Sequence, residues 1–259
     1  KGYAVHSLRS QSDKAFYHTL MKQIVENEPH LDVKQLMIDE VCVEQGRVVG
    51  VIDETGAMFA AHCVILSTGT YLKGRIVFGS VNFASGPNGM RPANKLSESL
   101  LAHDVKVMRF KTGTPARVDK RSLDFSKMEI QEGDPELHNF SYVSTITERK
   151  QVPCWLTYTN TSTHEIIKKN LKLSGMFNGL VAGVGPRYCP SIESKIVRFA
   201  DKDRHQLFIE PEGLNTNEMY VQGMSSSLPA AVQLEFLRTI PGLEHVEMMR
   251  PGYAIDYDC

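Results

Sequence analysis

One cysteine of the chain stands where a helix is expected to begin, a setting that can make a thiol reactive. Cys189 lies within residues 185–199, which read GPRYCPSIESKIVRF. Pro190 suits the first position of a helix, and apolar residues then recur at helical spacing. The free N–H groups and the dipole of a helix start favour an anion, and the charge of Arg187 favours the thiolate further. We predict that Cys189 lies at or just before the N-cap as a reactive thiolate.

The alternative for this residue is a buried thiol that serves packing alone, as most free cysteines do. We expect that packing role for Cys42 and Cys63, which lie among strand residues, and for Cys154 beside Trp155. The five cysteines are scattered and form no C-x-x-C pair. This pattern argues against a disulfide framework or a zinc site, so we predict no bound metal and a reducing compartment.

The hydrophobic pattern of the first hundred residues predicts one helix followed by short strands. Ser12 or Asp13 caps a helix with apolar residues four apart, and Pro29 ends it. The expected strands span residues 33–36, 37–43, 48–52 and 58–61, with a buried apolar run at 64–67. Residues 80–100 read as a loop because breakers are frequent there. The pattern predicts the α/β class.

From about residue 105 the character changes to short strands, polar loops and isolated helices. Ser162 and Glu165 are predicted to form a capping box. His164 between them could be catalytic, but a histidine on the surface of the first turn is the preferred interpretation. Pro229 and Ala230 are expected to open a further helix.

Composition indicates a folded soluble protein that can bury a sizeable core. The chain has 259 residues, 42% hydrophobic and 23% charged, and no apolar run approaches the roughly 20 residues of a membrane span. The net charge of −1 gives no global attraction to nucleic acid. Contacts with RNA would then depend on a local basic stretch, from which we select Arg109, Lys111 and Arg117. A solvated charged face is the alternative.

The segment around Cys189 resembles the signature segment of the MnmG (GidA) family of flavin-dependent tRNA uridine-modifying enzymes. Six further segments resemble the family in its order: FKTGTPAR at 110–117, QVPC at 151–154, TN and TH within 159–164, FIEPEG at 208–213, SSSLP at 225–229 and RPGYAIDYD at 250–258. The resemblance extends along essentially the whole chain. It is much more specific than a single glycine motif.

The resemblance implies a fold in two parts. Residues 1–106 would form a partial FAD/NAD(P)-binding Rossmann domain of the glutathione-reductase type, with a β-meander. Residues 107–259 would form an inserted α+β domain for NAD and substrate, returning to the FAD domain near 250–259. The family's G-x-G-x-x-G turn for the FAD pyrophosphate does not occur in this sequence. The chain is therefore expected to be an internal fragment that also lacks the C-terminal domain and is inactive alone.

The implied reaction modifies C5 of the wobble uridine of tRNA. FAD is reduced by NADH, methylenetetrahydrofolate provides one carbon, and the GTPase MnmE acts as partner of a homodimer. The product carries an aminomethyl or carboxymethylaminomethyl group. Cys189 matches one of the family's two reactive cysteines, either as the nucleophile at C6 of uracil or as an aid to proton transfer or elimination. The expected location is the bacterial cytoplasm, or the mitochondrion in a eukaryote, without membrane attachment.

The resemblance also assigns cofactor contacts. For FAD they are Ile38, Thr68, Gly69 and Ala93, where Ala93 replaces a serine of many members, so only a backbone contact could survive. For NAD they are Gly185, Pro186, Arg187, Tyr188, Cys189, Pro190, Ser191, Ile192, Glu193, Ser194, Lys195, Ile196, Val197, Arg198 and Phe199.

Three other interpretations stay open. The chain could come from a folate- and FAD-dependent tRNA uridine methyltransferase (TrmFO), a smaller relative, although the match around Cys189 and the inserted domain favour MnmG. A second alternative is an NAD(P)H-dependent flavin oxidoreductase that acts on small molecules. The third is a binding fragment without turnover.

Overall fold

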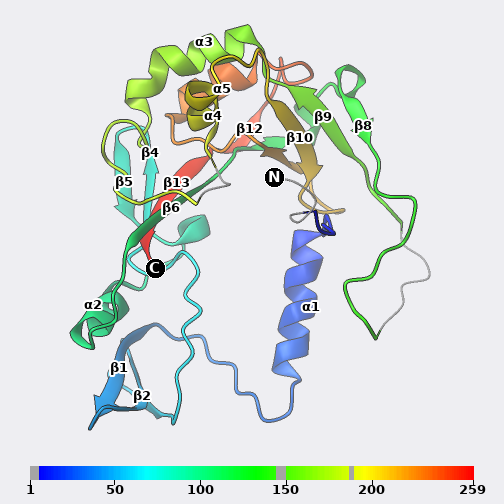
Figure 1. Cartoon of the computed structure of the whole chain (residues 1–259). Coiled ribbons are helices and arrows are strands. Elements are labelled where there is room, and N and C mark those ends of the chain that lie inside the picture. Colours follow the sequence, from blue (N-terminus) through cyan, green and yellow to red (C-terminus); the bar gives the residue numbers. More distant parts are fainter. Residues whose placement is uncertain (1–5, 144–149, 187–189) are drawn as a thin grey trace.

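A computed structural model describes residues 6–143, 150–186 and 190–259. The fold belongs to the mixed α/β class, as expected, and its strands pair antiparallel in three sheets within this part of the chain (Figure 1). The α-helices are α1 (Lys14–Glu26), α2 (Asn94–Ala102), α3 (Thr161–Asn170), α4 (Ile192–Arg198) and α5 (Ala230–Leu237). None of the helices in the described ranges is both long and apolar enough to cross a membrane.

The predicted N-terminal helix is confirmed as α1. Its N-cap is Asp13, whose Oδ1 accepts a hydrogen bond of 2.8 Å from the backbone N–H of Phe16. The other carboxylate oxygen accepts from the N–H of Leu214 at 2.7 Å. Asp13 therefore fixes the start of the helix to the loop beyond a distant strand, while no residue of α1 itself is buried.

The predicted hairpin is confirmed as β1 (Ile38–Glu44) and β2 (Arg47–Asp53), with β3 (Met58–Ala60) as the third strand of the first sheet. Val41 lies opposite Val51 in the register. Gln45 and Gly46 both have positive φ, 48° and 76°, which is the backbone of a tight hairpin turn. Local turn chemistry therefore sets this sheet.

Three local predictions were wrong. Residues 33–36 and 64–67 form no strand, and Ile65 is 91% exposed, because neither segment lies beside a partner strand in the described structure. Residues 80–100 are not a continuous loop. They contain β5 (Val81–Ala84) and α2, in which Leu96 and Leu100 are buried one helical turn apart.

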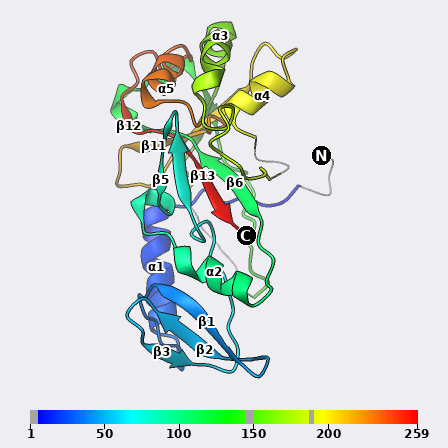
Figure 2. The same cartoon turned by 90° about the vertical axis from the view of Figure 1, so that its left-hand side faces the viewer.

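The second sheet joins segments that are far apart in the chain. Its order is β5, β4 (Arg75–Phe78), β13 (Tyr253–Asp258) and β6 (Arg109–Thr114) (Figures 1 and 2). The central strand β13 brings the C-terminal residues next to β4. The sheet thus takes strands from both sides of residue 106, and the division into two domains stays a prediction.

The largest sheet carries the main core. Its six strands follow the order β12 (Met248–Arg250), β7 (Arg117–Asp119), β11 (Glu218–Gln222), β10 (Gln206–Pro211), β9 (Cys154–Tyr158) and β8 (Glu129–Gln131). Helices α3, α4 and α5 gather over it (Figure 1). Ile167, Ile196 and Phe236 from these helices pack with Leu207 and Val221 from the strands, all at most 1% exposed. This core gives α4 a rigid base.

The start of α3 corrects two predictions. Its N-cap is Asn160, which forms a capping box with Thr163, because this pair satisfies both backbone N–H groups. His164 is not on the surface. It is 7% exposed, its Nε2 lies 2.7 Å from the Thr159 hydroxyl oxygen, and its ring centroid lies 5.3 Å from that of His205.

This histidine pair predicts a loss of stability in mild acid. Burial lowers the pKa of both His164 and His205 below the ordinary histidine value of about 6.5, so the unfolded chain binds more protons than the folded one below that pH. The free energy of unfolding should therefore fall as pH drops through 6.5, which urea unfolding across a pH series measures. Replacing His205 with glutamine should flatten the fall, whereas changing the exposed His18 to asparagine should leave it intact. An equal slope in both variants would contradict this explanation.

The cysteines follow the packing prediction in part. Burial raises the pKa of Cys42 in β1 and of Cys154 in β9, which keeps both thiols protonated. Cys63 is exposed, so its predicted burial was wrong. The loop that carries it pairs with no strand within the described chain.

Candidate functional site

A pocket of about 380 Å³ opens between β6, residues 183–186 and the start of α4. Six of the residues predicted to contact NAD line it: Gly185, Pro186, Pro190, Ser191, Ser194 and Arg198. Five residues that were given no NAD contact complete most of the wall: Lys111, Thr112, Gly183, Met176 and Ser225. We treat this pocket as the candidate site.

Residues 183–186 form one wall of the pocket and are held there by a short backbone pairing with β6. The N–H of Val184 donates to the carbonyl of Arg109, and the N–H of Lys111 donates to the carbonyl of Val184, both at 3.0 Å. A Cβ at Gly183 would lie 2.5 Å from the carbonyl carbon of Phe110, so only glycine allows this approach. The pairing holds Gly185 beside the side chain of Lys111.

The opposite wall is the start of α4, which begins later than predicted. The N-cap is Ser191, whose hydroxyl accepts from the N–H of Ser194 at 3.2 Å, so neither Cys189 nor Pro190 occupies that position. A serine hydroxyl accepts this bond better than a thiol does, which explains the shift. The N–H of Ile192 donates to the carbonyl of Ser225 at 2.9 Å and fixes α4 to a third segment.

The predicted reactive residue lies outside the described part of the chain. Arg187, Tyr188 and Cys189 are not described, so the assignments for them stay predictions. The residues on either side, Pro186 and Pro190, both line the pocket.

The other described residues of the predicted NAD segment do not line the pocket. Ile192 and Ile196 are buried in the main core, and Glu193 is fully buried. The ammonium of Lys195 donates to the carbonyl of Gly223 at 2.9 Å. Val197 and Phe199 are each 48% exposed and do not line the pocket.

The pocket is electropositive. Among the described residues that line it, Lys111 and Arg198 are charged and none is acidic. Burial lowers the pKa of Lys111, and the nearby charge of Arg198 lowers it further, while Glu193 and Asp256 act in the opposite direction. Three residues with hydroxyl side chains, Thr112, Ser194 and Ser225, also line the cavity. Two cations with hydroxyl donors are suited to bind an anion with several oxygens.

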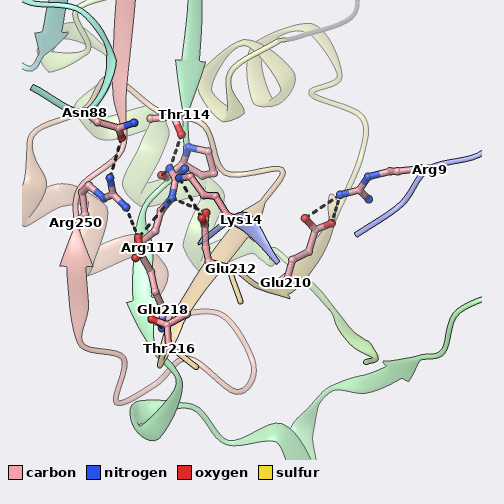
Figure 3. Close-up of polar contacts among 11 residues, drawn as sticks. Arg9, Lys14, Asn88, Thr114, Arg117, Glu210, Glu212, Thr216, Glu218 and Arg250 are labelled. Carbon is pink, nitrogen blue, oxygen red and sulfur yellow. Dashed lines mark hydrogen bonds and ion pairs between the residues drawn. The ribbon is translucent and has the colours of Figure 1, made fainter. Parts of the chain in front are cut away.

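Two of the three arginine and lysine residues predicted to contact tRNA are engaged within the protein. Arg117 is 8% exposed, and its Nε donates to Glu212 at 3.0 Å (Figure 3). Its guanidinium carbon lies 4.4 Å from the ring centroid of Tyr220. Arg109 donates to Asp256 and Asp258, each at 2.9 Å. Only Lys111 of the three lines the pocket. A tRNA contact of these residues stays a prediction.

Two of the four residues predicted to contact FAD pack against a second, small core. Ile38 and Ala93 both pack against the cluster that contains Leu72. Ala93 also exchanges backbone hydrogen bonds of 2.9 and 3.0 Å with Tyr71 and Lys73.

The predicted Thr68–Gly69 turn leads into this core. The carbonyl of Thr68 accepts from the N–H of Tyr71 at 3.0 Å. Gly69 has a φ of 53°, and the nearest atom to a Cβ there would be 4.0 Å away. The backbone is therefore open to a ligand at this turn. Ala93 is the N-cap of α2 and makes no side-chain hydrogen bond there.

Comparison with known proteins shows which family the chain belongs to. Residues 1–259 match the family model described as glucose inhibited division protein A. A protein of Caldicellulosiruptor saccharolyticus named tRNA uridine 5-carboxymethylaminomethyl modification enzyme MnmG is 57% identical over 259 residues, which are 100% of this chain and 41% of that protein. A protein of the same name from Heliobacterium modesticaldum is 56% identical over 258 residues, covering 100% of this chain and 40% of its own length.

The solved structures agree as well. The structure of Aquifex aeolicus GidA in its form I crystal has a TM-score of 0.91 and 46% identity, and the match covers 100% of this chain and 44% of that one. The form II crystal gives a TM-score of 0.89 at 44% identity, with 100% of this chain and 42% of that one covered. The chain thus spans about two fifths of the length of the relatives it matches. It belongs to the glucose inhibited division protein A family.

Proposed function

We propose that the pocket binds the phosphates of NADH in an enzyme that modifies the wobble uridine of tRNA. The observation that supports this most is the presence of both Lys111 and Arg198 in the pocket, whose described lining residues include no carboxylate. A pyrophosphate carries two negative charges and several acceptor oxygens, which suit one ammonium, one guanidinium and nearby hydroxyls. The names of the relatives support the RNA substrate.

The FAD of this enzyme is proposed to lie against Ile38, Thr68, Gly69 and Ala93. The open backbone at Gly69 fits close approach of a ligand, and Ala93 offers only its main chain. FAD supplies the redox chemistry of the reaction when it is bound, with NADH as the reductant. The protein's part is to hold the nicotinamide dinucleotide by its phosphates.

The further components of the proposal follow the family. Methylenetetrahydrofolate provides the carbon unit, the GTPase MnmE is the partner, and the enzyme is a cytoplasmic homodimer. Cys189 is proposed to react with the uracil ring, where addition of a thiolate to C6 makes C5 nucleophilic, or to move a proton there. The pocket residues on both sides of it, Pro186 and Pro190, support a place near the dinucleotide.

The charge of the pocket gives the test. In the full-length gene product, replacing Arg198 with methionine should raise the Kd for NADH about tenfold to a hundredfold, because a charged hydrogen bond to phosphate is lost. Replacing Lys111 with methionine should act in the same direction. Fluorescence titration with NADH measures both.

The matched control is Arg121, which is exposed, pairs with Asp119 and does not line the pocket. Its replacement by methionine should leave the Kd for NADH within about twofold, since a solvated pair contributes little. If the Arg198 and Lys111 variants bind NADH as tightly as the Arg121 variant, the pocket is not the dinucleotide site.

A further inference from the structure

A carboxylate is buried directly behind the pocket. Glu193, in the first turn of α4, is 0% exposed. Its Oε1 accepts three hydrogen bonds, from the hydroxyls of Ser174 and Ser226 at 3.1 and 3.0 Å and from the N–H of Ser227 at 3.0 Å. Its Oε2 is buried and has no hydrogen-bond partner among the described residues. Such a group is costly to bury, so its retention calls for a role.

The partners of Glu193 belong to two other segments, and neighbouring residues of both segments line the pocket. The hydroxyl oxygens of Ser174 and Ser227 lie 2.8 Å apart, and that of Ser227 accepts from the N–H of Met176 at 3.1 Å. Met176, two residues after Ser174, and Ser225, directly before Ser226, both line the pocket. The carboxylate of Glu193 therefore connects α4 with the segments that carry Met176 and Ser225.

The same carboxylate acts on the lysine of the pocket. Three charged side chains shift the pKa of Lys111: Glu193 and Arg198 on α4, and Asp256 on β13. Asp256 is already bound by Arg109 and Arg75. The negative charge of Glu193 opposes the effects of burial and of Arg198, both of which lower the pKa of Lys111.

We propose that Glu193 is a positioning residue of the pocket, whose buried carboxylate joins α4 to the segments that carry Met176 and Ser225 and acts on the side chain of Lys111. The inference rests on the proposed function for the identity of the ligand. The coupling between Glu193 and Lys111 can be measured without any ligand.

The direct test is the titration of Lys111 in the full-length gene product. Competitive acetylation at a series of pH values, read at Lys111 by mass spectrometry, gives its protonation. In Glu193→Gln the pKa of Lys111 should fall, so that acetylation at neutral pH is faster, because the charge that favours the ammonium is gone. The control is Glu210→Gln, which removes an equally buried carboxylate at 3% exposure that pairs with Arg9 instead. It should leave Lys111 unchanged.

A second variant separates position from charge. Ser226→Ala removes one hydrogen bond and keeps the carboxylate charge. Hydrogen exchange of the Met176 and Ser227 amides should then accelerate, whereas Lys111 should titrate as in the unchanged protein. Glu193→Gln should accelerate hydrogen exchange of the same amides. It should also weaken NADH binding about tenfold or more, since the side-chain amide of glutamine would then face hydroxyl donors in a buried position. Glu193→Asp should shift Lys111 in the same direction by less, and it serves if the glutamine variant does not fold.

The outcomes distinguish the two proposals. If the pKa of Lys111 and the exchange rates of both amides are the same in the Glu193 variants as in Glu210→Gln, the positioning role is wrong, whatever happens to NADH binding. If Lys111 and the amides change as expected but the unchanged protein does not bind NADH, the dinucleotide proposal fails and the positioning role stands.

Discussion

Replacing Asp256 with asparagine is expected to lower the free energy of unfolding by about 3 kcal/mol. Asp256 lies on the central strand β13 and is 0% exposed. One carboxylate oxygen accepts from Nε of Arg109 at 2.9 Å, and the other accepts from Arg75 at 3.2 Å. Without the negative charge, two partly buried guanidinium groups would face each other. Their exposures of 29% and 36% set the estimate at the lower end for a broken buried pair.

Urea unfolding followed by circular dichroism measures this effect, with Glu54→Gln as the control. Glu54 accepts two hydrogen bonds from Arg91, at 2.9 and 2.7 Å, but the two side chains are 37% and 71% exposed. An exposed pair of this kind contributes less than about 1 kcal/mol despite its good geometry. Equal losses in the two variants would mean that burial of Asp256 does not determine its contribution.

The elements that sequence predicted correctly are those whose signals are local. Asp13 caps α1 through a residue three positions on, and the hairpin of β1 and β2 needs only its own turn. The helix after Pro229 is confirmed as α5 for the same reason. In each case the residues that decide the structure lie within a few positions of one another.

The errors arise where the deciding partner is distant or where two local signals compete. The second sheet depends on β13 pairing with β4, more than 170 positions earlier, which no local pattern shows. At α3 both Asn160 and Ser162 are good capping residues, and the partner at the third position, Thr163, favours Asn160. The apolar run at 64–67 satisfied the pattern for a buried strand but has no described strand to join.

The candidate site shows the same division. Half of the described NAD segment lines the pocket, since Ser191, Ser194 and Arg198 follow helical spacing from one another. Ser225 was within a matching motif without any assigned role. Glu193 was predicted as an NAD contact, yet it is buried and does not line the pocket, because serines from two distant segments satisfy it. Such a network is visible only in three dimensions.

Replacing Cys189 with serine in the full-length gene product is expected to reduce modification of the wobble uridine by roughly a thousandfold. Both roles left open for this residue, nucleophile or proton transfer, lead to a loss of that order. A serine hydroxyl in place of the thiol stays protonated at neutral pH, so it provides neither a strong nucleophile nor a proton acceptor. Mass spectrometry of nucleosides from tRNA treated with each variant measures the product.

Two controls decide whether the thiolate itself matters. Cys63→Ser alters an exposed cysteine that matches no reactive position of the family, and it should retain modification activity. Alkylation of the unchanged protein should be fast at Cys189 below the pH at which a free cysteine reacts fully, because only the thiolate attacks the reagent. If Cys189 instead follows the profile of free cysteine and the serine variant keeps its activity, the residue serves packing. The pocket beside it would then bind the dinucleotide without a covalent step on the RNA from this segment.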